Sequence, residues 1–167
     1  DFQFQTTTRI DDKTTLSFLG ISLIDEFSFA APREAKTEKL YIINSSPLIN
    51  QWSYTVGATL RRLTKNGFWT ASLSRNTLDN QADKFEDNKN QVENERTLLI
   101  KSRETENKLR LDNTHNIGGY KLTYGLSAQL VQFDNKFFQR FRPVLTDGQG
   151  NVIQEAEILN SKTSANF

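Results

Sequence analysis

Five charged residues stand at alternate positions between residues 104 and 112. They are Glu104, Glu106, Lys108, Arg110 and Asp112. Alternate residues of a β-strand point to one face and lie roughly 7 Å apart, so these side chains form a row that carries both signs of charge. Such a row can make ion pairs in a wet lumen or against a plug domain. It can equally be the solvated outer face of a soluble sheet.

Other residues that could do chemistry are few. His115 is the only histidine, and we interpret it as a solvated residue of a short turn at residues 115–119. Four acids in a polar stretch could offer oxygens to Ca²⁺, but they lack the spacing and the glycine of an EF-hand loop. These acids are Asp79, Asp83, Glu86 and Asp87. No phosphate-binding loop, nucleophile elbow or recognisable pair of catalytic carboxylates occurs. The sequence predicts no enzyme, no cofactor and no metal site.

Aromatic and arginine side chains gather in stretches that we predict to be long loops. They are Phe27, Phe29, Arg33, Tyr41, Phe137, Phe138, Arg140 and Arg142. Loops on a rigid scaffold often carry recognition, so these residues are candidates for contact with a ligand or a surface lipoprotein. The alternative is that the loops pack on themselves.

Composition narrows the class of protein. The 167 residues carry a net charge of +1, which gives no reason to expect a nucleic-acid partner. There are no cysteines, which excludes disulfides and thiolate metal sites. No stretch approaches the roughly 20 apolar residues of a spanning helix. The first residues have no features of a secretory signal, and the chain reads as a piece of something longer.

The elements that must position these residues are strands. Residues 51–75 alternate in polarity around Asn66-Gly67, a pair typical of a two-residue type I′ hairpin turn. That turn would place Leu60 opposite Leu73, with the apolar residues of both arms on one face. A bulge at Gly20 would reconcile the two apolar faces of the second strand.

The whole chain divides into six predicted strands and three long connections. The strands lie near residues 2–10, 14–25, 51–65, 68–77, 97–113 and 120–133, and the loops span 26–50, 78–96 and 134–167. Pro32 could begin a short helix that runs toward Tyr41. Residues 147–150 predict a local turn. Short and long connections alternate, as they do in an outer-membrane barrel.

The apolar face has the dimensions of a membrane barrel. Tyr120 to Leu130 alternates without charge, and about eleven residues at ~3.3 Å each, tilted about 45°, cover roughly 25 Å along a bilayer normal. Aromatic residues near both ends of such strands suit the headgroup level. These interfacial candidates are Trp52, Tyr54, Trp69 and Tyr120. A soluble sandwich would show the same alternation, with its apolar side turned to a core.

Four stretches resemble the barrel of TonB-dependent outer-membrane receptors of the Bacteroidetes type. They are LSFLGISLIDEFSFAAP (16–32), QWSYTVGATLRRL (51–63), FWTASLSRN (68–76) and ENKLRLDNT (106–114). The resemblance implies a barrel of about 22 strands, plugged by an N-terminal domain. It also implies import of a scarce nutrient, driven by periplasmic TonB. A plug, a TonB box and a C-terminal closing strand are not in this sequence.

The predicted fold class is all-β, an antiparallel up-and-down segment of a transmembrane β-barrel, with short periplasmic turns and long extracellular loops. Six strands are too few to close a membrane barrel, so the rest of the barrel is a predicted partner. The other predicted partners are the lipid bilayer, the plug domain, TonB and a surface lipoprotein. The predicted location is the bacterial outer membrane. The alternatives are a soluble binding or adhesion module and a subunit that donates strands to a multi-chain barrel.

Overall fold

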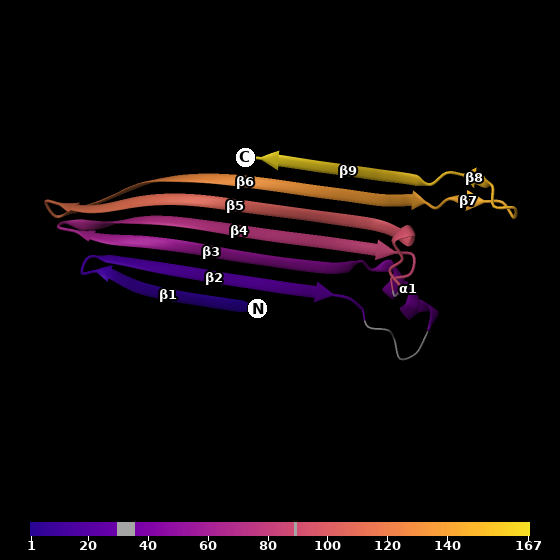
Figure 1. Cartoon of the computed structure of the whole chain (residues 1–167), viewed down its shortest axis with the longest axis horizontal. Coiled ribbons are helices and arrows are strands. Elements are labelled where there is room, and N and C mark those ends of the chain that lie inside the picture. Colours follow the sequence, from indigo (N-terminus) through magenta and orange to yellow (C-terminus); the bar gives the residue numbers. More distant parts are fainter. Residues whose placement is uncertain (30–35, 89) are drawn as a thin grey trace.

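The computed structural model describes residues 1–29, 36–88 and 90–167, and within these ranges the chain is all-β and antiparallel. Seven strands pair in the order β1-β2-β3-β4-β5-β6-β9 (Figure 1). Their bounds are β1 Phe2–Asp11, β2 Thr14–Phe27, β3 Leu48–Thr64, β4 Gly67–Phe85, β5 Arg96–Ile117, β6 Tyr120–Arg142 and β9 Glu157–Asn166. The all-β, antiparallel part of the predicted fold class is therefore confirmed.

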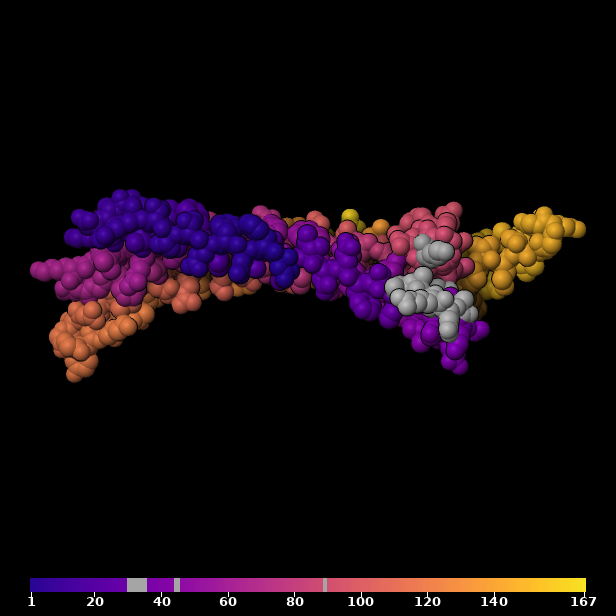
Figure 2. All heavy atoms as spheres, turned by 90° about the horizontal axis from the view of Figure 1, so that it is seen from below, coloured from indigo at the N-terminus to yellow at the C-terminus, as the bar shows by residue number. Residues whose placement is uncertain are grey.

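The sheet is one layer thick and is not closed. Seen from its β1 edge it is a thin, twisted plate (Figure 2). A soluble sandwich needs a second layer over Leu122 and Leu126, yet these side chains are 53% and 78% exposed, and the described residues provide no such layer. In the same ranges only Phe85 and Leu99 are buried hydrophobic residues. β1 and β9 each have one neighbouring strand.

Short and long connections lie at opposite ends of the sheet (Figure 1). The long-loop end carries the helix α1 (Thr37–Ser45), the 3₁₀ turn η1 (Glu93–Glu95) and the hairpin of β7 (Leu145–Thr146) and β8 (Val152–Gln154). The predicted alternation of connections is confirmed. Within the described ranges, no helix has the length and apolarity to cross a bilayer.

Two predicted features of the long connections have different outcomes. The turn at residues 147–150 is confirmed by a hydrogen bond of 3.1 Å from the Gly150 amide to the Asp147 carbonyl. The hydrogen bond that the Asn151 side chain donates holds the pKa of the Asp147 carboxyl below its usual value. The predicted helix start at Pro32 lies outside the described residues. The observed helix, α1, continues past Tyr41 to Ser45.

The β3–β4 hairpin forms with a different turn from the one predicted. Thr64 pairs with Gly67, so the turn residues are Lys65 and Asn66, and Leu60 lies opposite Ala71 instead of Leu73. The type I′ prediction was wrong, because neither Asn66 nor Gly67 has a positive φ. The register is displaced by two residues. A displacement by an even number keeps every side chain on its predicted face.

A turn with two positive φ angles does occur, but between β5 and β6. Gly118 and Gly119 have φ angles of 56° and 84°, and Ile117 pairs with Tyr120 across them. Both central residues of a type I′ turn need positive φ, which glycine adopts without strain. The His115–Gly119 stretch was predicted as the turn, whereas only its two glycines leave the strands.

Several strands are longer than predicted. β4 runs to Phe85 and β6 to Arg142, so residues 78–85 and 134–142 are strand where loops were predicted. The predicted loop 134–167 also contains β9. The bulge predicted at Gly20 is absent, because the pairing of β2 with β1 and β3 continues unbroken through that residue. A side chain at Gly20 would overlap the Phe4 ring.

Candidate functional site

One face of the sheet carries apolar residues from six strands, and we call this surface the apolar belt. Register places every member on the same side, because directly opposed residues share a face. Its main members are Phe2, Phe4, Leu16, Phe18, Ile24, Trp52, Tyr54, Val56, Leu60, Trp69, Leu73, Leu109, Leu111, Tyr120, Leu122, Tyr124, Leu126 and Leu130. Many of these side chains are exposed in the sheet.

The belt crosses the strands at a slant. One row of opposed residues joins Leu126, Leu111, Ala71, Leu60 and Leu16. On β6 this row crosses the middle of the apolar run. On β2 the same row meets the first apolar position of the strand. The belt therefore shifts toward the long-loop end of the sheet as it passes from β6 to β1.

The hairpin ends follow the same slant (Figure 1). Thr14 opens β2, yet the register places it level with Tyr124, which is four residues into β6. The hairpin ends are therefore displaced by about one residue from each strand to the next. With a rise of ~3.3 Å per residue and ~4.8 Å between neighbouring strands, this displacement corresponds to a strand tilt of roughly 35°. A closed barrel requires a strand tilt of this size.

All four aromatic residues that we predicted to be interfacial lie on the face of the belt. Trp52 and Tyr54 stack with centroids 6.1 Å apart near the long-loop side. Trp69 and Tyr120 lie near the short turns. The aromatic residues thus occur at the two margins of the belt.

On the same face, between the belt and the long-loop end, polar side chains form pairs with one another. Asp79 is 3% exposed and accepts a hydrogen bond of 2.8 Å from Nε of Arg103. The Arg103 guanidinium also lies over the Trp52 ring, 5.4 Å from its centroid. The buried hydroxyls of Thr77 and Thr105 are 3.3 Å apart. This layer separates the belt from the long-loop end.

Replacing Arg103 with glutamine leaves the nearly buried Asp79 carboxylate without its cation. We expect a loss of about 1 kcal/mol in the free energy of unfolding, because the half-exposed arginine weakens the pair through solvent screening. Chemical denaturation in one fixed detergent measures it. Arg9→Gln is the control, because its pair with Asp12 is largely exposed. Equal losses in the two variants would contradict the assigned role of Asp79.

The opposite face, which we call the wet face, is lined by polar ladders. Hydroxyl and amide side chains pair across strands, with 2.9 Å between Thr7 and Ser17 and 3.0 Å between Thr59 and Ser72. All five charged residues of the predicted lumen row lie here: Glu104, Glu106, Lys108, Arg110 and Asp112. The sheet thus separates an apolar surface from a polar one.

Within the charged row, one ion pair is formed along the strand. Nε of Arg110 donates to a carboxylate oxygen of Asp112 at 2.7 Å. Gly125 faces Asp112 on β6, and a side chain at Gly125 would overlap that carboxylate. Among the described residues, no ion pair joins Glu104, Glu106 or Lys108 to a partner. These three charged groups are available to something outside the sheet.

β2 is apolar on both faces. Leu19, Ile21 and Leu23 lie on the wet face and are 42%, 38% and 47% exposed. Their neighbours across β1 and β3 are polar, as in the pairs of Leu19 with Gln5 and Ile21 with Thr55. An apolar stripe therefore interrupts the wet face along one strand.

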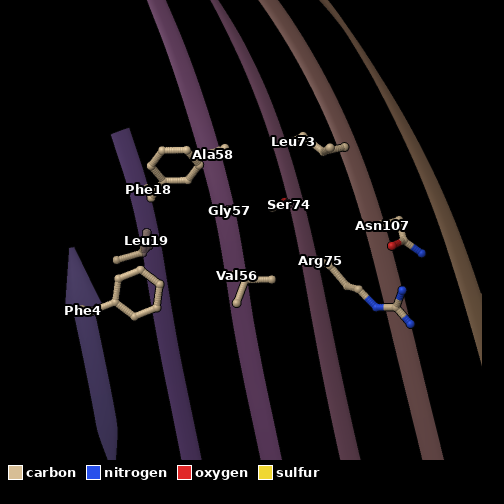
Figure 3. A pocket seen from close by; sticks show the side chains of 10 residues that line it. All are labelled: Phe4, Phe18, Leu19, Val56, Gly57, Ala58, Leu73, Ser74, Arg75 and Asn107. Atoms are coloured by element: carbon tan, nitrogen blue, oxygen red, sulfur yellow. The ribbon is translucent and has the colours of Figure 1, made fainter. Parts of the chain in front are cut away.

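A hollow of about 410 Å³ lies in the apolar belt (Figure 3). Phe4 and Phe18 stand on one side of it and Leu73 on the other, with Val56 and Ala58 between them. Arg75 reaches over one end toward Asn107. The hollow arises where small residues of β3 lie between larger side chains, and its apolar lining offers no acid or base for catalysis.

The predicted loop-recognition residues do not form one site. Phe27 and Phe29 make an edge-to-face contact with centroids 5.1 Å apart, and Tyr41 on α1 is 73% exposed. Phe27 ends β2, and Phe137, Phe138, Arg140 and Arg142 lie in β6, so placing these five residues in loops was wrong. Arg33 lies outside the described residues.

The long connections are tied to one another. The Asn88 side chain donates to the carbonyls of Ile43 and Ser46 and accepts from the Phe85 amide. Arg140 donates to the Asn94 carbonyl and lies 3.4 Å from Glu86. These contacts join α1, the β4–β5 connection and the end of β6.

The acids and the histidine have structural surroundings. Asp79 and Asp83 lie in β4 and face Arg103 and Arg96, and Glu86 faces Arg140. Asp87 accepts a hydrogen bond from the Asn90 amide. His115 lies in β5, so its predicted place in a turn was wrong. In the described ranges no group of three metal-ligating side chains forms.

Comparison with protein families, with characterised proteins and with solved structures finds no match to this chain. The site is therefore defined by geometry alone: a slanted apolar belt on one face of a single sheet and a polar surface on the other.

Proposed function

We propose that this sheet is part of the wall of an outer-membrane β-barrel, of the TonB-dependent receptor type, that imports a nutrient ligand. The slanted apolar belt on a single-layer sheet is the observation that carries the proposal. Lipid-facing residues form a level band in a membrane, so tilted strands must cross that band obliquely. The belt and the hairpin ends slant together, as tilted strands require.

The exposure of the belt also supports a lipid environment. Leu126, Leu130 and Tyr120 are 78%, 70% and 82% exposed. In water, a contiguous apolar surface of this kind marks an interaction site or promotes aggregation. Acyl chains would cover it without a second protein layer. The open edges at β1 and β9 fit further strands of the same barrel.

The wet face supports a lumen that contains a packed body such as a plug domain. An empty aqueous channel gives no reason for the apolar stripe of Leu19, Ile21 and Leu23. The unpaired charges of Glu104, Glu106 and Lys108 likewise suit ionic contacts with a second surface. Plug movement powered by TonB, ligand capture at the long-loop end and a surface lipoprotein partner belong to the proposal through the resemblance.

Single cysteines introduced into the complete polypeptide test the proposal, because this sequence has none of its own. We expect a fluorophore attached to a cysteine at Leu122, Leu126 or Leu130 to be quenched by spin-labelled acyl chains. Cysteines at Thr123, Ser127 and Gln129 should instead react with a charged thiol reagent in membranes. Equal behaviour of the two sets would refute the membrane assignment.

The two open edges also fit a barrel to which several chains contribute strands. The mass of the folded assembly in detergent separates this alternative from a single-chain barrel. A mass of one polypeptide supports the single-chain barrel, and a trimer mass supports the multi-chain one.

Replacing Lys108 and Arg110 together with glutamine should loosen the plug. The plug would lose its contact with the free Lys108, and Asp112 would lose the ion pair that Arg110 makes along the strand. We therefore expect urea to open the channel at a lower concentration, with an equilibrium for release shifted about tenfold or more. Conductance across a planar bilayer measures this opening without any ligand. Lys13→Gln with Lys65→Gln is the control, because it removes the same charge at the short turns. An unchanged opening profile in the Lys108/Arg110 variant would contradict plug contact at the charged row.

A further inference from the structure

Three lysines lie side by side on the face of the apolar belt. Lys101 on β5 is directly opposite Lys136 on β6, and Lys136 is directly opposite Lys162 on β9. Opposed residues in antiparallel strands have Cβ atoms roughly 5 Å apart, and like charges in such positions destabilise the sheet. A row of three cations across three adjacent strands would therefore be stabilised by a counter-charge.

The sheet itself supplies only part of that counter-charge. Among the ion pairs of the described residues, none includes Lys101, Lys136 or Lys162. On the same face Asp79 is paired with Arg103, and Asp83 lies against Arg96. Asp134 lies two residues nearer the belt than Lys136, and its hydrogen bonds come from the neutral Ser164 and Gln132, so one unpaired anion stands beside three unpaired cations. The basic row thus has an excess of positive charge.

The height of the row indicates what could neutralise it. The apolar run of β6 ends at Leu130, and Lys136 is six residues further toward the long loops. At ~3.3 Å per residue and a tilt of about 40°, that is roughly 15 Å beyond the hydrocarbon edge. Phospholipid headgroups extend only about 5–8 Å beyond that edge. Anions at the level of the lysines must therefore be carried further out, as phosphates on the sugars of a glycolipid are.

We propose that the Lys101–Lys136–Lys162 row docks the phosphate groups of a phosphorylated glycolipid in the outer leaflet, a step that rests on the proposed membrane function. The belt below would contact the acyl chains of the same molecule. Each ammonium group can donate several hydrogen bonds to phosphate oxygens, and these bonds are strengthened by charge. Bound phosphates would offset the mutual repulsion of the three ammonium groups.

The test uses the complete polypeptide, folded in detergent and in bilayers, with lipopolysaccharide as the probe. Lys101→Gln/Lys136→Gln/Lys162→Gln should bind lipopolysaccharide about tenfold more weakly than wild type. Lys13→Gln/Lys65→Gln/Lys121→Gln should bind it normally, because these lysines lie at the short-turn end. Removing the phosphates should weaken binding as much as removing the lysines does. Wild type should therefore bind phosphatase-treated lipopolysaccharide about tenfold more weakly than intact lipopolysaccharide. Binding that is equal for both variants and both probes overturns the inference.

A second readout separates this inference from the proposed function. Lys136→Gln should raise the unfolding midpoint in glycolipid-free detergent, where it relieves repulsion, and lower it when lipopolysaccharide is bound. The same shift in both conditions overturns the inference, as does equally tight binding to vesicles of phosphatidylglycerol. If the protein enters bilayers and only these results fail, the barrel proposal stands. If it does not enter bilayers, both proposals fail.

Discussion

Arginine in place of Leu126 is expected to destabilise the protein in a bilayer by several kcal/mol, whereas arginine in place of the adjacent Ser127 should cost little. Leu126 lies in the middle of the apolar run of β6, and a cation at the bilayer midplane of a barrel costs roughly 2–4 kcal/mol. Ser127 points to the wet face opposite Arg110, so we expect only the cost of about 0.2–1 kcal/mol that two opposed cations bring. Reversible urea unfolding from lipid vesicles measures both values.

The position of a residue along the bilayer normal provides an internal control for this prediction. Tyr120 lies on the same face as Leu126 but at the margin of the belt, beside the short turn. Tyr120→Arg should therefore cost only about 0–1 kcal/mol, because the penalty falls toward the interface. Equal costs at residues 120, 126 and 127 would show that the belt does not face a bilayer.

The second large effect is expected from Gly67→Ala. A Cβ at residue 67 would overlap the carbonyl of Thr114 on β5, which is backbone and cannot rotate away. We expect a loss of about 1–3 kcal/mol in the free energy of unfolding, as for other overpacked sites. The change should also weaken the hydrogen bond from the Asn116 amide to the Asn66 carbonyl.

Gly148→Ala is the matched control, because nothing lies within 4 Å of a Cβ at that position and its φ is not positive. Its free energy of unfolding should change by less than about 0.5 kcal/mol. Hydrogen exchange at Asn116 locates the effect of Gly67→Ala in the hairpin end. If the two variants were equally stable, the β4–β5 contact would not constrain residue 67.

Asn66-Gly67 shows where prediction from sequence succeeds and where it fails. The pair marked the hairpin, and the side-chain period of two placed each residue on its observed face. The turn type could not be predicted, because Gly67 is required by the approach of β5 and not by its own φ. The contact with Thr114 is long-range, and local patterns carry no information on such contacts.

The upper parts of β4 and β6 were missed for a related reason. Alternation is visible in a sequence only where the two faces meet different surroundings. Beyond Leu78 both faces of β4 are largely polar, and beyond Gln132 both faces of β6 mix phenylalanine with polar residues, so neither stretch alternates. The strands continue there because their neighbours do, as the pairs of Asp83 with Leu48 and Leu99 show. The lysine row lies in this missed region and becomes visible only through register.

The extension of the strands beyond the belt has a consequence for how a ligand would first meet the protein. Roughly the second half of β6 continues past Leu130, and at a tilt of about 40° it stands roughly 30 Å above the hydrocarbon edge. With the belt in a bilayer, this part of the sheet would form a rigid collar around a vestibule outside the cell. A solute would meet a hydrogen-bonded wall that is already ordered before contact. A particle wider than the vestibule would be excluded at its rim.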